Sequence, residues 1–272
     1  KRSMKRKLLL NSATFTERNF WGNTSSITFY PVHEPGWYLR TKSGDVPINY
    51  KIARAKHGYI QLCVENDLGN VYEHISPLRS LGYDGIALKF HDKWPPYCGG
   101  VRAYLAFFKK ELRFKTTDDD IPYIGPSQSS EAFRKDRSSF VKIVPVSDKR
   151  LHMDVLSQWR PLPTYRRKFV FEAMSLEDQQ RIWDAKPQGD PQYYRKLFAK
   201  VLHTFGWPNM QHISWKSDGT PHQIAEEWWY HAVQDTIGAV NLCDHIALPA
   251  ASVKRAYGGH ALDLEAVKKA FQ

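Results

Sequence analysis

Short runs in which apolar and polar residues alternate dominate the first two thirds of the chain. This period of two is typical of half-buried β-strands, and turn residues such as Ser43-Gly44-Asp45 separate the runs. The pattern predicts strands at 26–30, 36–40, 58–64, 85–90, 140–146 and 167–173. A series of strands of this length favours a sandwich or a barrel.

After residue 174 the apolar residues recur at steps of three and four, as they do on helices. Ser175 and Asp178 have the spacing of a capping box, which predicts a short helix to about Ala185. Further helices are predicted at 190–206, from Thr220-Pro221 to about Ile246, and at 263–271. Residues 101–115 fit both periods, and we assign them to a strand.

We therefore expect an α+β fold, with a β-rich N-terminal sandwich or barrel followed by a mainly helical C-terminal part. Three regions follow from the pattern: a basic N-terminal arm at 1–24, a β-rich body at 25–174 and a helical region at 175–272. No internal repeat is detectable. Because the sequence opens on Lys1 and lacks the apolar core of a secretory signal, we expect it to start inside a longer chain.

Composition indicates the cellular compartment in which we expect the protein. No apolar run approaches the ~20 residues of a membrane span, so we expect no membrane partner. Cys63, Cys98 and Cys243 are odd in number and far apart, which argues against a disulfide framework or a cysteine-based zinc site. An intracellular, reducing compartment is the expected location, whether nucleus, cytoplasm or virion.

Positive charge is concentrated at the start of the chain. Residues 1–60 hold 11 Lys and Arg against 3 Asp and Glu, which is +8 of the formal net charge of +11. A basic segment attracts phosphate through a long-range term that does not depend on base sequence. The candidate nucleic-acid-binding residues are Lys1, Arg2, Lys5, Arg6, Lys7, Lys109, Lys110, Arg113, Arg166, Arg167 and Lys168.

The charge favours a non-enzymatic nucleic-acid-binding protein that acts in a nucleoprotein assembly. Its helical C-terminal region would then contact protein partners or further copies of the chain. A basic arm before a β-rich body is similar to the plan of many icosahedral virus coat proteins, so a capsid or nucleocapsid protein is the most concrete version of this hypothesis. The kind of nucleic acid stays open.

Two other hypotheses remain. A metal-dependent enzyme acting on DNA or RNA would use carboxylates such as Asp84, Glu111 or Asp154, and a protein-interaction scaffold would carry its charge incidentally. The glycine-rich nucleotide-binding motifs and the G-x-S-x-G elbow are absent.

One helix raises the question of a metal site. Glu227 and His231 lie four residues apart on the predicted helix 220–246, a spacing that could begin a set of metal ligands. Without an H-E-x-x-H order we interpret such pairs as surface ion pairs. We assign no catalytic residue, no metal ligand and no cofactor.

Overall fold

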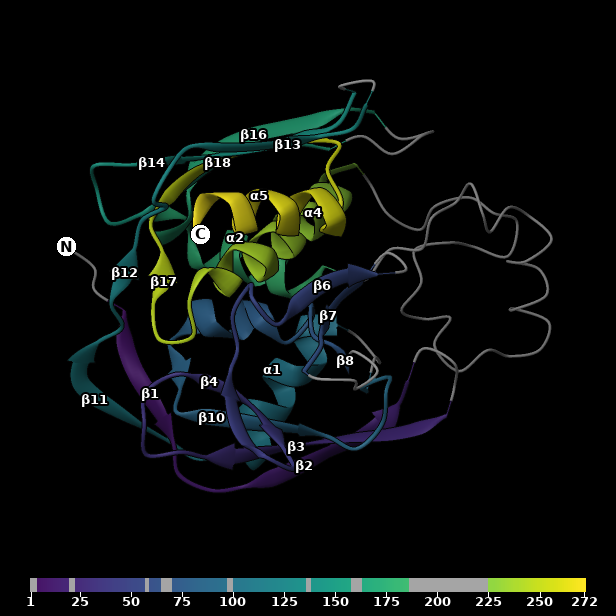
Figure 1. Cartoon of the computed structure of the whole chain (residues 1–272), viewed down its shortest axis with the longest axis vertical. Coiled ribbons are helices and arrows are strands. Elements are labelled where there is room, and N and C mark those ends of the chain that lie inside the picture. Colours follow the sequence, from purple (N-terminus) through teal and green to yellow (C-terminus); the bar gives the residue numbers. More distant parts are fainter. Residues whose placement is uncertain are drawn as a thin grey trace.

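Two five-stranded sheets enclose a layer of helices (Figure 1). The structure is a computed structural model, and it describes residues 4–19, 23–56, 59–64, 70–96, 100–135, 138–157, 163–185 and 225–272. The first sheet has the order β2-β3-β10-β4-β5, and the second has the order β13-β14-β18-β15-β16. One sheet forms the bottom layer of Figure 1 and the other forms the top layer.

The strands of the two large sheets lie far apart in sequence. Those of the first are β2 (Ala13–Arg18), β3 (Thr24–Pro31), β4 (Trp37–Thr41), β5 (Gly44–Pro47) and β10 (Ile86–Phe90). Those of the second are β13 (Ser130–Phe133), β14 (Phe140–Pro145), β15 (Leu151–Ser157), β16 (Tyr165–Val170) and β18 (Ala251–Ala256). The runs that the sequence pattern predicted near 26–30, 36–40, 85–90 and 140–146 are confirmed as strands.

The two sheets share one topology. In each, two antiparallel hairpins come first, and a later strand inserts between them, antiparallel to one hairpin and parallel to the other. The inserted strand β10 is followed by helix α1 (Gly100–Glu111), and the inserted strand β18 is followed by helix α5 (His260–Ala270). The chain therefore contains a structural repeat that its sequence does not reveal.

Three smaller sheets lie between or beside the large ones. The first has the order β11-β1-β9, with β1 (Lys5–Leu9), β9 (Tyr83–Asp84) and β11 (Phe114–Asp120). The second consists of β6 (Ala53–Lys56), β7 (Tyr59–Leu62) and β8 (Asn70–Val71). The third pairs β12 (Tyr123–Ile124) with β17 (Leu248–Pro249) in parallel.

The expected fold class is wrong. The described residues are strand-rich, with five sheets spread along the chain, so a β-sandwich followed by a mainly helical part does not describe them. Strand β18 comes from the region expected to be helical, yet it is the central strand of the second sheet. Residues 100–111 form helix α1 where we expected a strand, because Tyr104, Phe107 and Phe108 recur at helical spacing and pack against the first sheet.

The remaining helices of the described residues are α2 (Leu176–Asp184) and α4 (Ala225–Val240), with short 3-10 turns η1 (Ser76–Leu81), η2 (Phe171–Ala173) and η4 (Asn241–Cys243). The predicted cap of α2 is confirmed, since Ser175 Oγ accepts a hydrogen bond from the Asp178 amide at 3.0 Å. The predicted helices near 220–246 and 263–271 correspond to α4 and α5. The helix predicted at 190–206 lies outside the described residues.

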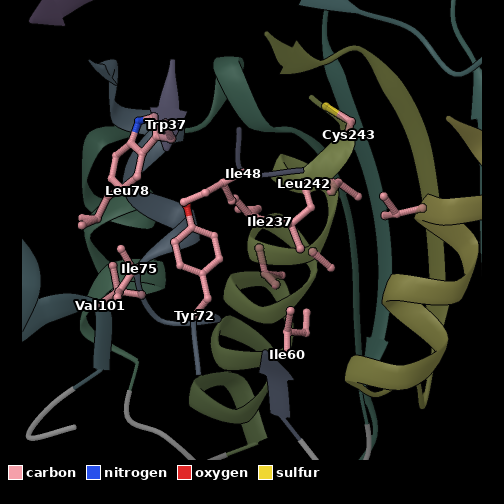
Figure 2. Close-up of a cluster of buried hydrophobic side chains, with 14 of the residues drawn as sticks. Trp37, Ile48, Ile60, Tyr72, Ile75, Leu78, Val101, Ile237, Leu242 and Cys243 are labelled. Carbon is pink, nitrogen blue, oxygen red and sulfur yellow. The ribbon is translucent and has the colours of Figure 1, made fainter. Parts of the chain in front are cut away.

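One hydrophobic core joins the two structural repeats. The first repeat ends with helix α1 and the second begins with strand β13, and we call them the first and second halves. Figure 2 shows Trp37 and Leu78 from the first half gathered around the same cluster as Ile237 and Leu242 from the second half. All four side chains are at most 1% exposed. Because these contacts cross between the halves, the two halves do not have separate interiors.

A buried arginine fastens the end of helix α4 to η1. The Arg79 guanidinium is 3% exposed and donates to the carbonyl oxygens of Asn241, Asp244 and Ala247. No carboxylate takes part in these hydrogen bonds, so the positive charge is balanced by carbonyl dipoles at the end of the helix.

We expect Arg79→Met to lower the free energy of unfolding by about 2–4 kcal/mol, because three buried carbonyls lose charged donors. Urea denaturation measures the change. Arg134→Met, at an exposed position after β13, is the matched control, and its effect should stay within about 0.5 kcal/mol. Equal losses in the two variants would contradict this role of Arg79.

Candidate functional site

Five ionisable side chains meet between the two halves of the molecule. Glu73 and His74 lie between β8 and η1, His231 and Asp235 lie on α4, and His260 is the first residue of α5. We call this group the His–carboxylate cluster. More than 150 residues of sequence separate its first members from the others.

Close packing of η1 against α4 brings these segments together. Ser76 Oγ donates to the Gly238 carbonyl oxygen at 2.6 Å, and Asn241 Nδ2 donates to the Ser76 carbonyl oxygen at 3.0 Å. A Cβ atom on Gly238 would lie 3.0 Å from the carbonyl oxygen of Glu73. Glycine at this position therefore allows the helix to approach the Glu73 backbone.

The cluster is a set of imidazole–carboxylate pairs. His231 Nε2 lies 3.4 Å from Asp235 Oδ1, one helical turn further along α4. His260 Nε2 lies 3.4 Å from Glu73 Oε2 and 4.0 Å from Asp235 Oδ2. His74 Nε2 lies 3.9 Å from Glu73 Oε1, and its ring centroid is 6.4 Å from that of His231. Both carboxylates therefore lie between imidazoles.

The side chains differ in depth. Those of Glu73, His74 and His231 are 3%, 6% and 8% exposed, whereas those of Asp235 and His260 are 12% and 15% exposed. The second pair therefore forms the more accessible edge. Nδ1 of His231 and Nδ1 of His260 are two of several buried side-chain atoms that lack a hydrogen-bond partner among the described residues. Such orphaned atoms are uncommon in folded proteins and mark a site that needs explanation.

Burial and mutual charge shift the protonation of the cluster. Burial raises the pKa of Glu73 to about 7, although His260 opposes the shift. Burial and neighbouring His231 lower the pKa of His74 to about 3, and burial also lowers the pKa of His231. These two imidazoles are therefore neutral near pH 7, with a lone pair on one ring nitrogen of each.

Asp235 and His260 shift in the direction of their charged forms. Burial alone would raise the pKa of Asp235, but His231, His260 and Arg255 together outweigh burial and lower it. Burial alone would lower the pKa of His260, but Glu73 and Asp235 outweigh burial and raise it. The site thus combines two imidazoles whose pKa is lowered, a carboxyl group whose pKa is lowered and an imidazole whose pKa is raised.

A buried ion pair supports the cluster from one side. Arg255 Nε lies 3.0 Å from Asp263 Oδ1, and Arg255 Nη2 lies 3.3 Å from Asp263 Oδ2. Both side chains are at most 5% exposed. This pair joins β18 to α5, so it fixes the start of the helix that carries His260, and the Arg255 charge helps to keep Asp235 ionised.

The donor types suit a divalent metal ion. Zinc prefers imidazole nitrogen and carboxylate oxygen, and donors at ~2.0–2.1 Å from one tetrahedral ion lie about 3.3 Å from each other. The 3.4 Å separation between His231 Nε2 and Asp235 Oδ1 matches this spacing. Within the described residues, no group of three or more His, Cys, Asp or Glu side chains is placed so that it could hold a metal ion. The donors approach each other in pairs.

The structure distributes the basic residues predicted from sequence over several surfaces. Lys5, Arg6 and Lys7 lie on strand β1, where Lys5 pairs with Asp120 at 3.0 Å and Arg6 with buried Asp84 at 2.6 Å. Lys1 and Arg2 lie outside the described residues.

The other predicted cations lie on different elements. Lys109 and Lys110 lie in the last turn of helix α1, which ends at Glu111, and Arg113 follows the helix. Arg167 pairs with Asp178 at 2.9 Å, whereas Arg166 and Lys168 lie around Asp154 on the outer side of the second sheet.

The carboxylates that the enzyme hypothesis used are engaged elsewhere. Asp84 pairs with Arg6, Glu111 with Lys110 at 3.1 Å, and Asp154 with Arg166. The sequence did contain one sign of the cluster, the four-residue spacing from His231 to Asp235 on a helix. We had paired His231 with Glu227, one turn in the other direction.

Comparison with known proteins does not assign the chain. No protein-family model matches the sequence, and no curated protein matches it. In the described part of the chain, no helix is both long and apolar enough to cross a bilayer.

The raised pKa of Glu73 predicts a pH-dependent penalty on stability. The folded state binds this proton more tightly than the unfolded chain, whose value is near 4.5, so stability is lost as pH rises from there toward about 7. Gln cannot ionise and avoids the penalty. The gain in free energy of unfolding from Glu73→Gln should therefore grow by about 2–3 kcal/mol between pH 5 and pH 8.

Urea denaturation in the presence of a chelator measures this gain at each pH. Glu265→Gln, on the exposed side of α5, supplies the baseline for an unspecific pH effect. A gain from Glu73→Gln that does not change with pH would show that the carboxyl titrates at its ordinary value.

Proposed function

We propose that this protein is a metal-dependent hydrolase and that the His–carboxylate cluster is its active site. The observation that carries the proposal is the convergence of three imidazoles and two carboxylates in the interior, with donor atoms 3.4–4.0 Å apart. Burying so many ionisable groups costs free energy, and functional sites are where proteins accept that cost.

The five side chains of the His–carboxylate cluster fall into two groups, metal ligands and proton-transfer groups, according to the shifts in their pKa. His74, His231 and Asp235 supply two neutral imidazoles and one ionised carboxylate, the donor combination of catalytic zinc sites. The i, i+4 spacing on α4 supplies two of these ligands from one rigid element. Because these donors now approach each other only in pairs, binding one ion would require their side chains to rearrange.

The two remaining groups suit proton transfer. An ion at the cluster would lower the pKa of a water molecule and polarise a substrate carbonyl. Glu73, with a pKa of about 7, can accept the water proton as the hydroxyl oxygen bonds to the carbonyl carbon. His260 can donate its proton to the leaving nitrogen or oxygen as the bond between that atom and the carbonyl carbon breaks. Glu73 then gains one proton and His260 loses one, so the total charge of the two side chains is unchanged.

This division of roles favours an amide or ester over a phosphodiester. Phosphodiester cleavage commonly uses two metal ions that hold both the attacking and the leaving oxygen, whereas one ion with one carboxylate base serves addition to a carbonyl. The net charge of +11 supports a substrate that carries negative charge.

The function predicted from charge alone remains a second proposal. Non-enzymatic nucleic-acid binding in an assembly, including a capsid role, has the excess of Lys and Arg as its support. The cluster instead favours a metal-dependent enzyme, with residues other than those the sequence suggested.

We expect the purified full chain to bind one Zn²⁺ per molecule. His231→Ala and Asp235→Ala should each weaken binding by at least about 100-fold, because each removes one ligand. Isothermal titration calorimetry after treatment with chelator gives the stoichiometry and the dissociation constant.

An exposed pair provides the matched control. His152 Nε2 lies 2.7 Å from Asp148 Oδ1, and both side chains are more than a third exposed. His152→Ala should leave the affinity for Zn²⁺ unchanged. If the parent chain binds no zinc in stoichiometric amount, or if His152→Ala weakens binding as much as His231→Ala, the proposed metal site is wrong.

Glu73→Gln separates catalysis from metal binding. This variant should hold Zn²⁺ within about threefold of the parent affinity yet lose about 10²–10⁴-fold in kcat, because the base is missing. The assay follows hydrolysis of amides and esters that bear a phosphate or carboxylate group. Turnover that survives Glu73→Gln and disappears with chelator would contradict the role of Glu73 as base.

A further inference from the structure

The outer face of the second sheet carries cations and aromatic rings side by side. It is the face turned away from helices α4 and α5, at the top of Figure 1. We call it the basic face and define it by Phe133, Phe140, Lys142, Arg166, Lys168 and Lys254. These side chains are exposed or half-buried, and Phe133 is 45% exposed.

Strand register arranges these residues in two rows. In one row the exposed acid Glu131 is opposite Lys142, and the row continues through Lys254 and Asp154 to Lys168. Since neighbouring strands are ~4.8 Å apart, this row extends over roughly 14 Å from its first lysine to its last. In the adjacent row Phe133 is opposite Phe140, and Arg166 lies on the last strand.

Two carboxylates, Glu131 and Asp154, lie among the four cations Lys142, Arg166, Lys168 and Lys254, so the face keeps a positive surplus. Arg166 donates to both Asp154 oxygens at 2.8 and 2.6 Å, and Lys168 lies 3.9 Å from the same carboxylate. The Lys254 ammonium lies 5.5 Å from the centre of the Phe140 ring. Between them is a hollow of about 140 Å³, lined partly by these residues. A positive surplus therefore surrounds a shallow site with an aromatic wall.

The equivalent face of the first sheet also places a cation beside a ring, because the Arg40 guanidinium lies 4.4 Å from the centre of the Tyr30 ring. Its central strand carries Lys89, and Arg40 there is paired with Asp45 at 2.8 Å. Thr14 and Thr28 share a hydrogen bond of 2.8 Å on neighbouring strands. The difference between the two faces is the pair of facing lysines, Lys142 and Lys254, where the first sheet has Thr28 opposite Lys89.

We propose that the basic face binds single-stranded nucleic acid. The phosphates would contact Lys142, Lys168 and Lys254, and unpaired bases would stack on Phe133 and Phe140. A flat sheet with exposed aromatic rings and cations offers both contacts, each stacked base being worth ~1–3 kcal/mol. A duplex hides its base faces, so stacking on exposed rings favours a single strand over a duplex. This inference is independent of the hydrolase proposal.

Fluorescence anisotropy of the full chain with a labelled 20-nucleotide single-stranded DNA, measured across a salt series, tests the proposal. The triple variant Lys142→Gln, Lys168→Gln, Lys254→Gln should weaken binding at least tenfold at low salt and flatten the salt dependence, because three phosphate contacts are lost. The matched triple variant Lys42→Gln, Lys51→Gln, Lys89→Gln removes the same charge from exposed positions elsewhere and should change binding less than twofold.

A second variant tests base stacking. Phe133→Leu keeps an apolar side chain at an exposed position and should weaken binding to single strands severalfold while leaving binding to duplex of the same length unchanged. Equal effects of the two lysine triple variants, or no binding by the parent chain at low salt, would overturn the proposal. Loss of heparin binding in step with DNA binding, with Phe133→Leu silent, would overturn it in favour of a general polyanion surface.

Discussion

Helix α4 has almost no surface left for water, and the interior of the molecule is arranged around that constraint. From Trp228 to Val240 every residue except Asp235 is buried. Its polar side chains must therefore find partners inside the protein. Trp229 donates to a carbonyl of the second sheet and Gln234 to a carbonyl of α2, whereas His231 and Asp235 have each other and the groups that α5 and the first half present.

The two halves share a topology but contribute unequally to the interior. The second half provides a long helix before its inserted strand, and the first half provides only the short turn η1 at the corresponding place. This asymmetry lets Glu73 and His74, which directly precede η1, face the helix across a close contact at Gly238. A symmetrical pair of long helices would have filled that space with side chains. The cluster therefore depends on the difference between the repeats.

The sequence predicts structure correctly where interactions between residues close together in the chain are enough to determine it. The Ser175 cap needs only two residues three positions apart, and it is present as expected. Residues 100–111 were misassigned because a run such as Val101 to Phe108 satisfies both periods, and only packing against the first sheet selects the helix. The place of β18 could not be read either, since pairing it between β14 and β15 is a contact across more than 90 residues.

The sequence did not predict the His–carboxylate cluster for a related reason. A four-residue spacing joins His231 both to Glu227 and to Asp235, and sequence alone does not say which of these carboxylates lies in the interior. That choice is made by the sheets and helices packed around α4, and it changes a pair expected at the surface into buried chemistry. Net charge misleads in a similar way, because Lys5 and Arg6 count as cations in the sequence but are paired with carboxylates in the fold. Strand register, by contrast, leaves Lys142 and Lys254 exposed side by side, a placement that the net charge does not indicate.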